Sequence, residues 1–238
     1  MTETAETRVR ARILALRDES YRAFHLALIP TVDPETVVGV RAPALRALAK
    51  ELRGTADAAE FLRALPHTLY EERNLHSMLI AQEPDFEAAL AAQERFLPCI
   101  DNWATCDLPA PRVFARHTAE LLPHVRAWLE SEHPYTVRYG VRMLMDFYLD
   151  EAFSPELPAL AAACAGRGEY YIDMGVAWYF AEGMAKRPAD FLPWLEQRRL
   201  PVWTHNMAIR KSCESYRVPA ETKERLRALR VKKDTTRG

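Results

Sequence analysis

Trp103 and Asp107 lie four residues apart in the segment "DNWATCDLPAPR", and they carry an aromatic ring and a carboxylate. The spacing predicts that both side chains project from one face of a helix, which the following prolines end. An indole face and a carboxylate held side by side can bind a positively charged group. The structural alternative is a packed tryptophan at a helix end, with the Asp107 carboxylate capping the next helix.

A second set of polar and aromatic residues recurs in the later part of the chain. Arg138 and Arg142 are expected on one helix face, with Tyr135 one turn before Arg138. The other candidates are Trp178, on a stripe with Tyr170 and Met174, and then His205, Asn206, Arg210 and Lys211, around the start of a later helix. Singly, such residues are more often explained by solvation or packing. Their recurrence in register favours a groove that holds a nucleic-acid backbone.

The elements that position these residues are predicted to be helices. The 238 residues contain only 8 glycines, and no Val/Ile/Thr alternation of useful length indicates a sheet. Pro43 and Gly54 suit the start and end of one helix, and Ser154 and Pro155 suit the N-cap and first position of another. We therefore expect an all-α protein.

A weak repeat is visible in the second half of the chain. Three segments each begin with an aromatic and polar turn and continue as an apolar helix: "YTVRYGVRMLMDFYLDE", "YYIDMGVAWYFAEGMAK" and "WTHNMAIRKSCESYRV". Their spacing, roughly 35 to 40 residues, is typical of paired-helix repeats. The repeat predicts an α-solenoid of HEAT/armadillo-like repeats with a concave groove, and the polar and aromatic residues described above make a nucleic-acid backbone its expected occupant.

Charge is distributed unevenly along the chain. Residues 51–101 hold ten acidic and four basic residues, whereas residues 195–238 hold five acidic and twelve basic residues, within a net charge of −1. A basic end can hold a polyanion on one face, although a solvated helical tail explains it equally well. We expect a single repeat domain over residues 1–230 and a basic, flexible tail over residues 231–238.

Several classes of protein are excluded by the sequence. The apolar runs fall far short of the roughly 20 residues that cross a bilayer, and the N-terminus lacks the apolar core of a secretory signal. We therefore expect a cytoplasmic protein, and a monomer. The 4 cysteines and 7 histidines show no CxxC or HExxH spacing, so we expect reduced thiols, no metal site and no cofactor.

From about Tyr21 to Leu229 the chain resembles the DNA alkylation repair family, the AlkD-like DNA glycosylases built from HEAT-like repeats. The motifs that carry the resemblance are "VVGVRAPALRALAKEL", "DNWATCD", "YTVRYGVRMLM" and "YYIDMGVAWYFAEGMAK". The resemblance implies double-stranded DNA as the partner and release of cationic N3- or N7-alkylated purines as the activity. No single motif is specific, but their combination over the full length is.

The resemblance also implies roles for individual residues. Asp107 matches the catalytic carboxylate, Trp103 and Trp178 match the cleft tryptophans that hold the substrate, and Arg138 matches a groove arginine. Tyr135 is a further substrate-binding candidate, and Arg142, His205, Asn206, Arg210 and Lys211 are DNA-binding candidates. The sequence departs from the family pattern where an arginine is expected three residues beyond the second tryptophan. Ala181 stands there, followed by Glu182, whose carboxylate opposes a phosphate backbone.

Three functions are therefore compatible with the sequence. The first is an alkylpurine DNA glycosylase, and the second is a non-catalytic module that binds damaged, bent or branched DNA by shape. The third is a solenoid whose groove binds a peptide or a partner helix. Release of a methylated base distinguishes the first, and an absence of DNA binding at low salt indicates the third.

Overall fold

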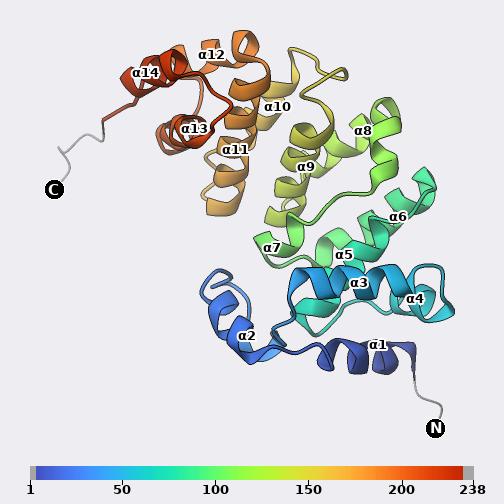
Figure 1. The fold of residues 1–238 in the computed structure, drawn as a ribbon. Helices are drawn as coiled ribbons and strands as arrows, with labels where there is room; N and C mark the ends of the chain where they lie inside the picture. The colour runs from blue at the N-terminus through green and yellow to red at the C-terminus, as the bar shows by residue number, and fades with distance from the viewer. Residues whose placement is uncertain (1–3, 233–238) are drawn as a thin grey trace. The chain divides into compact units, whose positions relative to one another are not determined.

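In the computed structural model, which describes residues 4–232, all regular elements are helical (Figure 1). The prediction of an all-α chain is confirmed for this range. Residues 233–238, and with them most of the predicted tail at 231–238, lie outside the described residues. None of the described helices is long and apolar enough to span a membrane.

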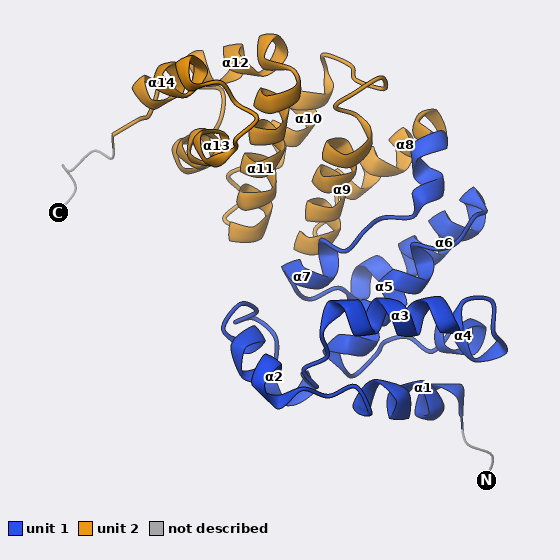
Figure 2. Ribbon diagram, viewed as in Figure 1, with its two compact units in different colours: residues 1–117 blue, residues 118–238 orange. Residues whose placement is uncertain are grey.

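The chain divides into two compact units, residues 1–117 and residues 118–238 (Figure 2). The α-helices of unit 1 are α1 (Ala5–Leu14), α2 (Glu19–Leu26), α3 (Ala42–Leu52), α4 (Ala56–Phe61), α5 (Tyr70–Ile80), α6 (Phe86–Phe96) and α7 (Trp103–Cys106). Its short 3-10 turns are η1 (Pro34–Thr36), η2 (Leu97–Cys99) and η3 (Arg112–Arg116). Unit 2 holds α8 (Thr118–Leu129), α9 (Pro134–Phe147), α10 (Leu157–Ala163), α11 (Tyr170–Lys186), α12 (Pro188–Glu196), α13 (Val202–Glu214) and α14 (Ala220–Ala228).

Unit 1 is organised around α5, in which all eleven residues are buried although several are charged. Glu71 shows how a buried charge is accommodated. Its carboxylate accepts hydrogen bonds from the backbone N–H groups of Val38, Gly39 and Val40, at 2.9, 2.7 and 3.2 Å. A carboxylate that receives several N–H groups is stabilised even without contact with water. Glu71 therefore fixes the loop that leads into α3.

Gly39 is the residue in this loop that no other amino acid could replace without strain. Its φ is +89°, and a Cβ at this position would lie 2.4 Å from Arg22 Cβ and 2.8 Å from Asp18 O. The "VVGVR" part of the first motif therefore serves a tight turn and close packing. The prediction for α3 is confirmed, because Pro43 lies in its first turn and Gly54, with φ +75°, follows its end.

The predicted start of α10 is wrong. The helix begins at Leu157 with Glu156 as its N-cap, and Pro158 occupies the first turn, so Ser154 and Pro155 precede it. A helix that began at Pro155 would place Pro158 at its fourth position, where proline cannot donate the backbone hydrogen bond. The start at Leu157 instead places Pro158 in the first turn, where no such bond is needed.

In unit 2, α9, α11 and α13 pack side by side, with α11 in contact with both neighbours. The intervening helices pack against them: α8 against α9, α12 against α11 and α14 against α13. Close contact requires a glycine where α11 meets α12, because a Cβ at Gly183 would lie 2.3 Å from the Phe191 ring. The arrangement agrees with repeated helix pairs in unit 2, and a solenoid with a groove stays a prediction.

Candidate functional site

The short helix α7 carries Trp103 and Asp107, and buried polar residues fix its position in unit 1. Asn102 is fully buried, and its side-chain oxygen caps α7 by accepting from Thr105 N at 2.8 Å. Asn102 also donates to Thr105 Oγ1 at 3.0 Å, and this hydroxyl donates to Asn74 Oδ1 of α5 at 2.7 Å. The network ties α7 to the central helix of the unit. Sequence reasoning missed it, although "DNWAT" is an N-cap pattern.

Trp103 is half-buried, and its indole is held in place by a hydrogen bond and by packing. Its indole Nε1 donates to the backbone oxygen of Leu28 at 3.0 Å, and the ring packs against the cluster around Ile29 and Tyr70. Packing therefore explains part of the Trp103 side chain, because one edge of its ring is in contact with this cluster. The half that stays accessible is held in a fixed orientation.

Asp107 is the residue that ends α7. Its N–H donates to Trp103 O at 2.9 Å, so the two residues span one helical turn as predicted, and its side chain is half-buried. The next helical element, η3, has Pro111 at its N-cap position and no side-chain cap hydrogen bond. The alternative in which the Asp107 carboxylate caps a following helix stays a prediction.

Arg138 is buried, with 5% of its surface exposed, and joins two helices of unit 2. Its guanidinium donates from one terminal nitrogen to Tyr171 O of α11 at 2.7 Å, and it packs beside Gly175. Tyr135, one turn earlier on α9, places its half-buried ring 5.8 Å from the ring of Tyr171. Arg138 is thus mainly engaged inside the unit, and a DNA contact by it stays a prediction.

Arg142 lies on α9 one turn after Arg138 and is half-buried. It forms an ion pair with Asp146 at 3.0 Å, within the same helix. Because Asp146 offsets the charge of Arg142, this part of α9 carries less net positive charge than its two arginines alone would give.

Trp178 lies on the partly exposed stripe of α11, as the sequence predicted. Tyr170 is 55% exposed, and Met174 and Trp178 are half-buried, whereas most residues on the other faces of the helix are buried. The stripe continues to Glu182, which is also half-buried. Ala181, by contrast, is 5% exposed, so position 181 does not belong to this stripe.

Glu182 has a partner that sequence reasoning missed. One terminal nitrogen of Arg217, in the loop after α13, donates to both carboxylate oxygens at 2.6 Å. Tyr216, next to it, is 92% exposed. No spacing signal joins Glu182 to a residue 35 positions later, so this pair was beyond the reach of the sequence pattern.

His205 and Asn206 hold the end of the described chain. His205 is fully buried with its Nε2 atom 3.0 Å from Leu229 O, and Asn206 exchanges two hydrogen bonds with the backbone of Val231, at 2.8 and 3.0 Å. A DNA contact by His205 is incompatible with this placement, because the side chain has no exposed surface. The first residue of the predicted tail, Val231, is therefore anchored.

The two remaining candidates of α13 are closer to solvent. Arg210 is exposed and pairs with Glu214 at 2.8 Å, and Lys211 is half-buried. Their predicted contact with DNA stays a prediction. The same is true of the convergence of Trp103 and Asp107, in unit 1, with residues of unit 2.

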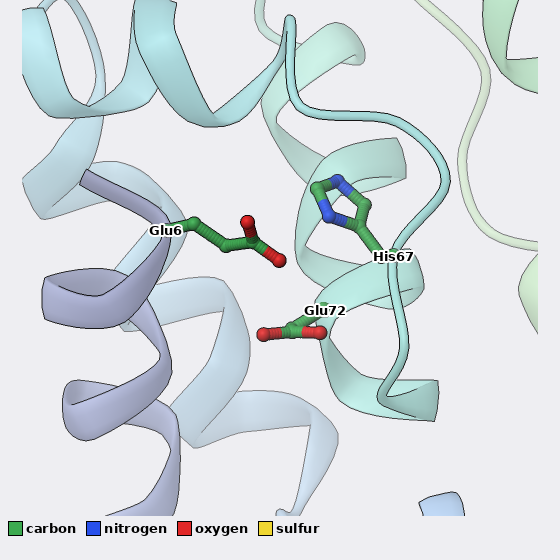
Figure 3. A group of neighbouring side chains, drawn as sticks. All are labelled: Glu6, His67 and Glu72. Carbon is green, nitrogen blue, oxygen red and sulfur yellow. The ribbon is translucent and has the colours of Figure 1, made fainter. Parts of the chain in front are cut away.

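A group of metal-ligating residue types lies between α1 and α5. Glu6, His67 and Glu72 bring ligand-type atoms within 4.8 Å of one another (Figure 3). Arg10 donates to Glu72 Oε1 at 2.7 Å and to Glu6 Oε1 at 3.1 Å, and the other oxygen of Glu72 accepts from Leu69 N at 2.9 Å. Because one guanidinium already forms ion pairs with both carboxylates, we interpret the group as a charge network that joins the two helices.

A protein-family model described as DNA alkylation repair enzyme matches residues 9–212. The match spans most of both units and includes Trp103, Asp107, Arg138 and Trp178. No curated protein matches the chain.

Proposed function

The chain belongs to the DNA alkylation repair enzyme family, and from this premise we propose that it hydrolyses the N-glycosidic bond of cationic N3- or N7-alkylated purines in DNA. Alkylation at either nitrogen leaves a positive charge on the base, which makes the base a better leaving group. Its departure develops positive charge on the deoxyribose, as in glycoside hydrolysis generally. The protein must therefore stabilise cationic character at the base and at the sugar.

The observation that carries this proposal is the fixed pairing of Trp103 and Asp107 on one turn of unit 1. The carboxylate of Asp107 is expected to stabilise the sugar cation and to position the attacking water. The accessible part of the Trp103 ring holds the cationic nucleotide by a cation–π contact of about 0.5 to 2 kcal/mol. The Asn102 network and the Leu28 hydrogen bond support this role, because they orient both groups in advance.

Unit 2 supplies the remaining contacts in this proposal. The paired helices α8 to α14 support a solenoid whose inner surface follows the DNA. Trp178, on the exposed stripe of α11, and Tyr135 contact the nucleotide, and Arg138, Arg142, Arg210 and Lys211 contribute positive potential toward the phosphates. No base needs to enter a deep pocket in such a groove.

Binding of damaged or distorted DNA without catalysis is the second candidate function, and Ala181 favours it. A small buried side chain at this position provides no guanidinium for a phosphate. Glu182 no longer favours this candidate strongly, because Arg217 neutralises its carboxylate.

A base-release assay on methylated duplex DNA separates the two candidates. The wild-type chain is expected to release 3-methyladenine or 7-methylguanine, and Asp107→Asn to lose at least about 100-fold in rate while still binding DNA. Glu87→Gln is the matched control, since Glu87 is an exposed carboxylate of α6 in the same unit. Wild-type binding without release would leave the second candidate, and unaltered release by Asp107→Asn would remove Asp107 from the mechanism.

A further inference from the structure

A cavity of about 520 Å³ opens on unit 1, between α3, the segment that follows α5, and η3. Its lining includes four buried apolar residues, Ala49, Met78, Ala110 and Val113. None of the residues assigned to the chemistry above lines this cavity. It is therefore a feature that the proposed function does not explain.

Five basic residues surround this apolar surface, and all five are exposed. Arg46, Lys50 and Arg53 follow one another at spacings of four and three along α3 and its end, so they share one helix face. Arg112 and Arg116, four residues apart, come from η3. Glu83 is the one carboxylate in the lining.

Within the described residues, the five basic side chains of the cavity all lack partners, a property that in unit 1 they share with Arg63 and Arg95 outside the cavity, and they differ from these two in being gathered around one cavity. Within residues 4–232 none of them forms an ion pair or a side-chain hydrogen bond. Six other arginines of unit 1 each pair with a carboxylate, namely Arg8, Arg10, Arg12, Arg17, Arg41 and Arg73. Carboxylates are plentiful in residues 51–101, so the cavity is a place where positive charge is left uncompensated.

A structural explanation covers only part of this set. Cations near a helix C-terminus interact favourably with the helix dipole, which accounts for Lys50 and Arg53 at the end of α3. Arg46 lies in the middle of α3, and Arg112 and Arg116 belong to another element. Holding five like charges around one cavity costs electrostatic free energy unless an anion offsets it.

We propose that this cavity binds the phosphate groups of a polyanion. Four of the five cations are arginines, whose planar guanidinium binds two phosphate oxygens at once. The apolar lining suits the carbon atoms of a sugar between successive phosphates. The backbone of duplex DNA is the source of phosphate that the proposed function implies, and the choice of DNA rests on that function. A free polyphosphate offers the same chemistry.

Two double variants of the full-length chain test the proposal, one on each side of the cavity: Arg46→Ala with Lys50→Ala, and Arg112→Ala with Arg116→Ala. Binding of an unmodified duplex is measured from low to moderate salt. Each double variant is expected to weaken binding about tenfold or more at low salt, and to reduce the slope of log K against log salt by about two.

The matched control is Arg63→Ala with Arg95→Ala, which removes two exposed cations of the same unit that lie outside the cavity. This control is expected to retain the wild-type salt slope. Because all six residues are exposed, none of the variants is expected to change the unfolding temperature, which is measured alongside. Cavity variants that bind DNA with the same slope as the control would exclude DNA as the source of the phosphates.

A second arm uses inorganic triphosphate, followed by calorimetry. If triphosphate binds the wild-type chain with one site and the cavity variants lose this binding, the cavity is a phosphate site whichever source it serves. If neither DNA nor triphosphate distinguishes the cavity variants from the control, the proposal is overturned. The base-release assay is separate: a chain that releases no base but shows the expected loss of binding retains the cavity proposal and loses only the catalytic one.

Discussion

Arg217 and Glu182 form an ion pair in which one guanidinium nitrogen donates to both carboxylate oxygens at 2.6 Å. Glu182 lies four residues after Trp178 on α11, so the pair shares the face of the helix that carries Trp178. The hydrogen bond to Glu182 raises the pKa of Arg217, which keeps the guanidinium charged. A carboxylate that would repel a phosphate backbone is thereby neutralised.

Arg217→Ala is expected to weaken binding of duplex DNA about fivefold to tenfold at low salt, because in the proposed DNA groove the carboxylate of Glu182 would then repel the phosphates without its partner. Adding Glu182→Gln should restore a large part of the affinity, since it removes the exposed negative charge. Fluorescence anisotropy measures both effects. A double variant that binds as weakly as Arg217→Ala would contradict this electrostatic explanation.

Arg225 provides the control for this pair. It is an exposed arginine of unit 2 that also pairs with a glutamate, Glu196. Arg225→Ala changes the net charge by the same amount, and it should alter DNA affinity less than twofold.

Asn102→Ala is expected to lower the free energy of unfolding by about 1 to 3 kcal/mol. It removes the N-cap of α7 and leaves the buried Thr105 hydroxyl with one partner fewer. Denaturant unfolding measures the cost. Base release should fall further than the lost stability explains, because α7 carries Trp103 and Asp107.

Asp85→Ala is the matched control for the cap. Asp85 caps α6 by accepting from Ala88 N at 2.8 Å, so its removal should cost about 1 kcal/mol of stability without changing base release. If Asn102→Ala and Asp85→Ala lost base-release activity equally, the hydrogen bonds of Asn102 would have no specific role in positioning α7 for catalysis.

Arg138→Ala is expected to destabilise the chain by about 2 to 4 kcal/mol, because it removes the hydrogen bond that joins α9 to the Tyr171 carbonyl and a large buried side chain. Thermal unfolding gives this value. DNA binding by this variant must be compared with wild type at a temperature where both are folded. A stable Arg138→Ala that no longer binds DNA would instead assign the residue to the phosphate contact.

Local sequence chemistry was sufficient where neighbouring residues decide the structure. Pro43 and Gly54 bound α3 as predicted, since a first-turn proline and a glycine with positive φ act within a few residues. Trp103 and Asp107 span one helical turn for the same reason. The family resemblance assigned candidate functional roles to Trp103 and Asp107 in this same segment.

The residues that sequence reasoning misplaced or missed have environments set by contacts between distant parts of the chain. His205 looks like an available cation near the start of α13, but the segment after α14 covers it and places Leu229 O against its ring. Glu71 looks like a surface charge, yet a loop more than thirty residues earlier supplies three N–H groups to it. Neither the burial of His205 nor the hydrogen bonding of Glu71 can be predicted from the spacing of residues along the sequence.

Acid pH is expected to destabilise unit 1 through two buried histidines. His67 Nε2 lies 2.8 Å from His76 Nδ1, and the rings stack on Phe61 and Phe96, with centroids 4.2 and 4.3 Å apart. Burial lowers the pKa of His67 to about 4 and that of His76 to about 2. In the unfolded chain both take up a proton below about pH 6.5.

Because the unfolded state binds these protons first, the free energy of unfolding is highest above pH 6.5 and falls as the pH approaches 4. Each imidazole contributes up to about 1.4 kcal/mol per pH unit to this fall. His76→Phe should lower stability at pH 7.5, since His67 loses its partner, but should reduce the slope between pH 6.5 and 4.5 by about half. Urea unfolding at several pH values measures the slope, and identical slopes in wild type and variant would show that the histidines do not set the acid sensitivity.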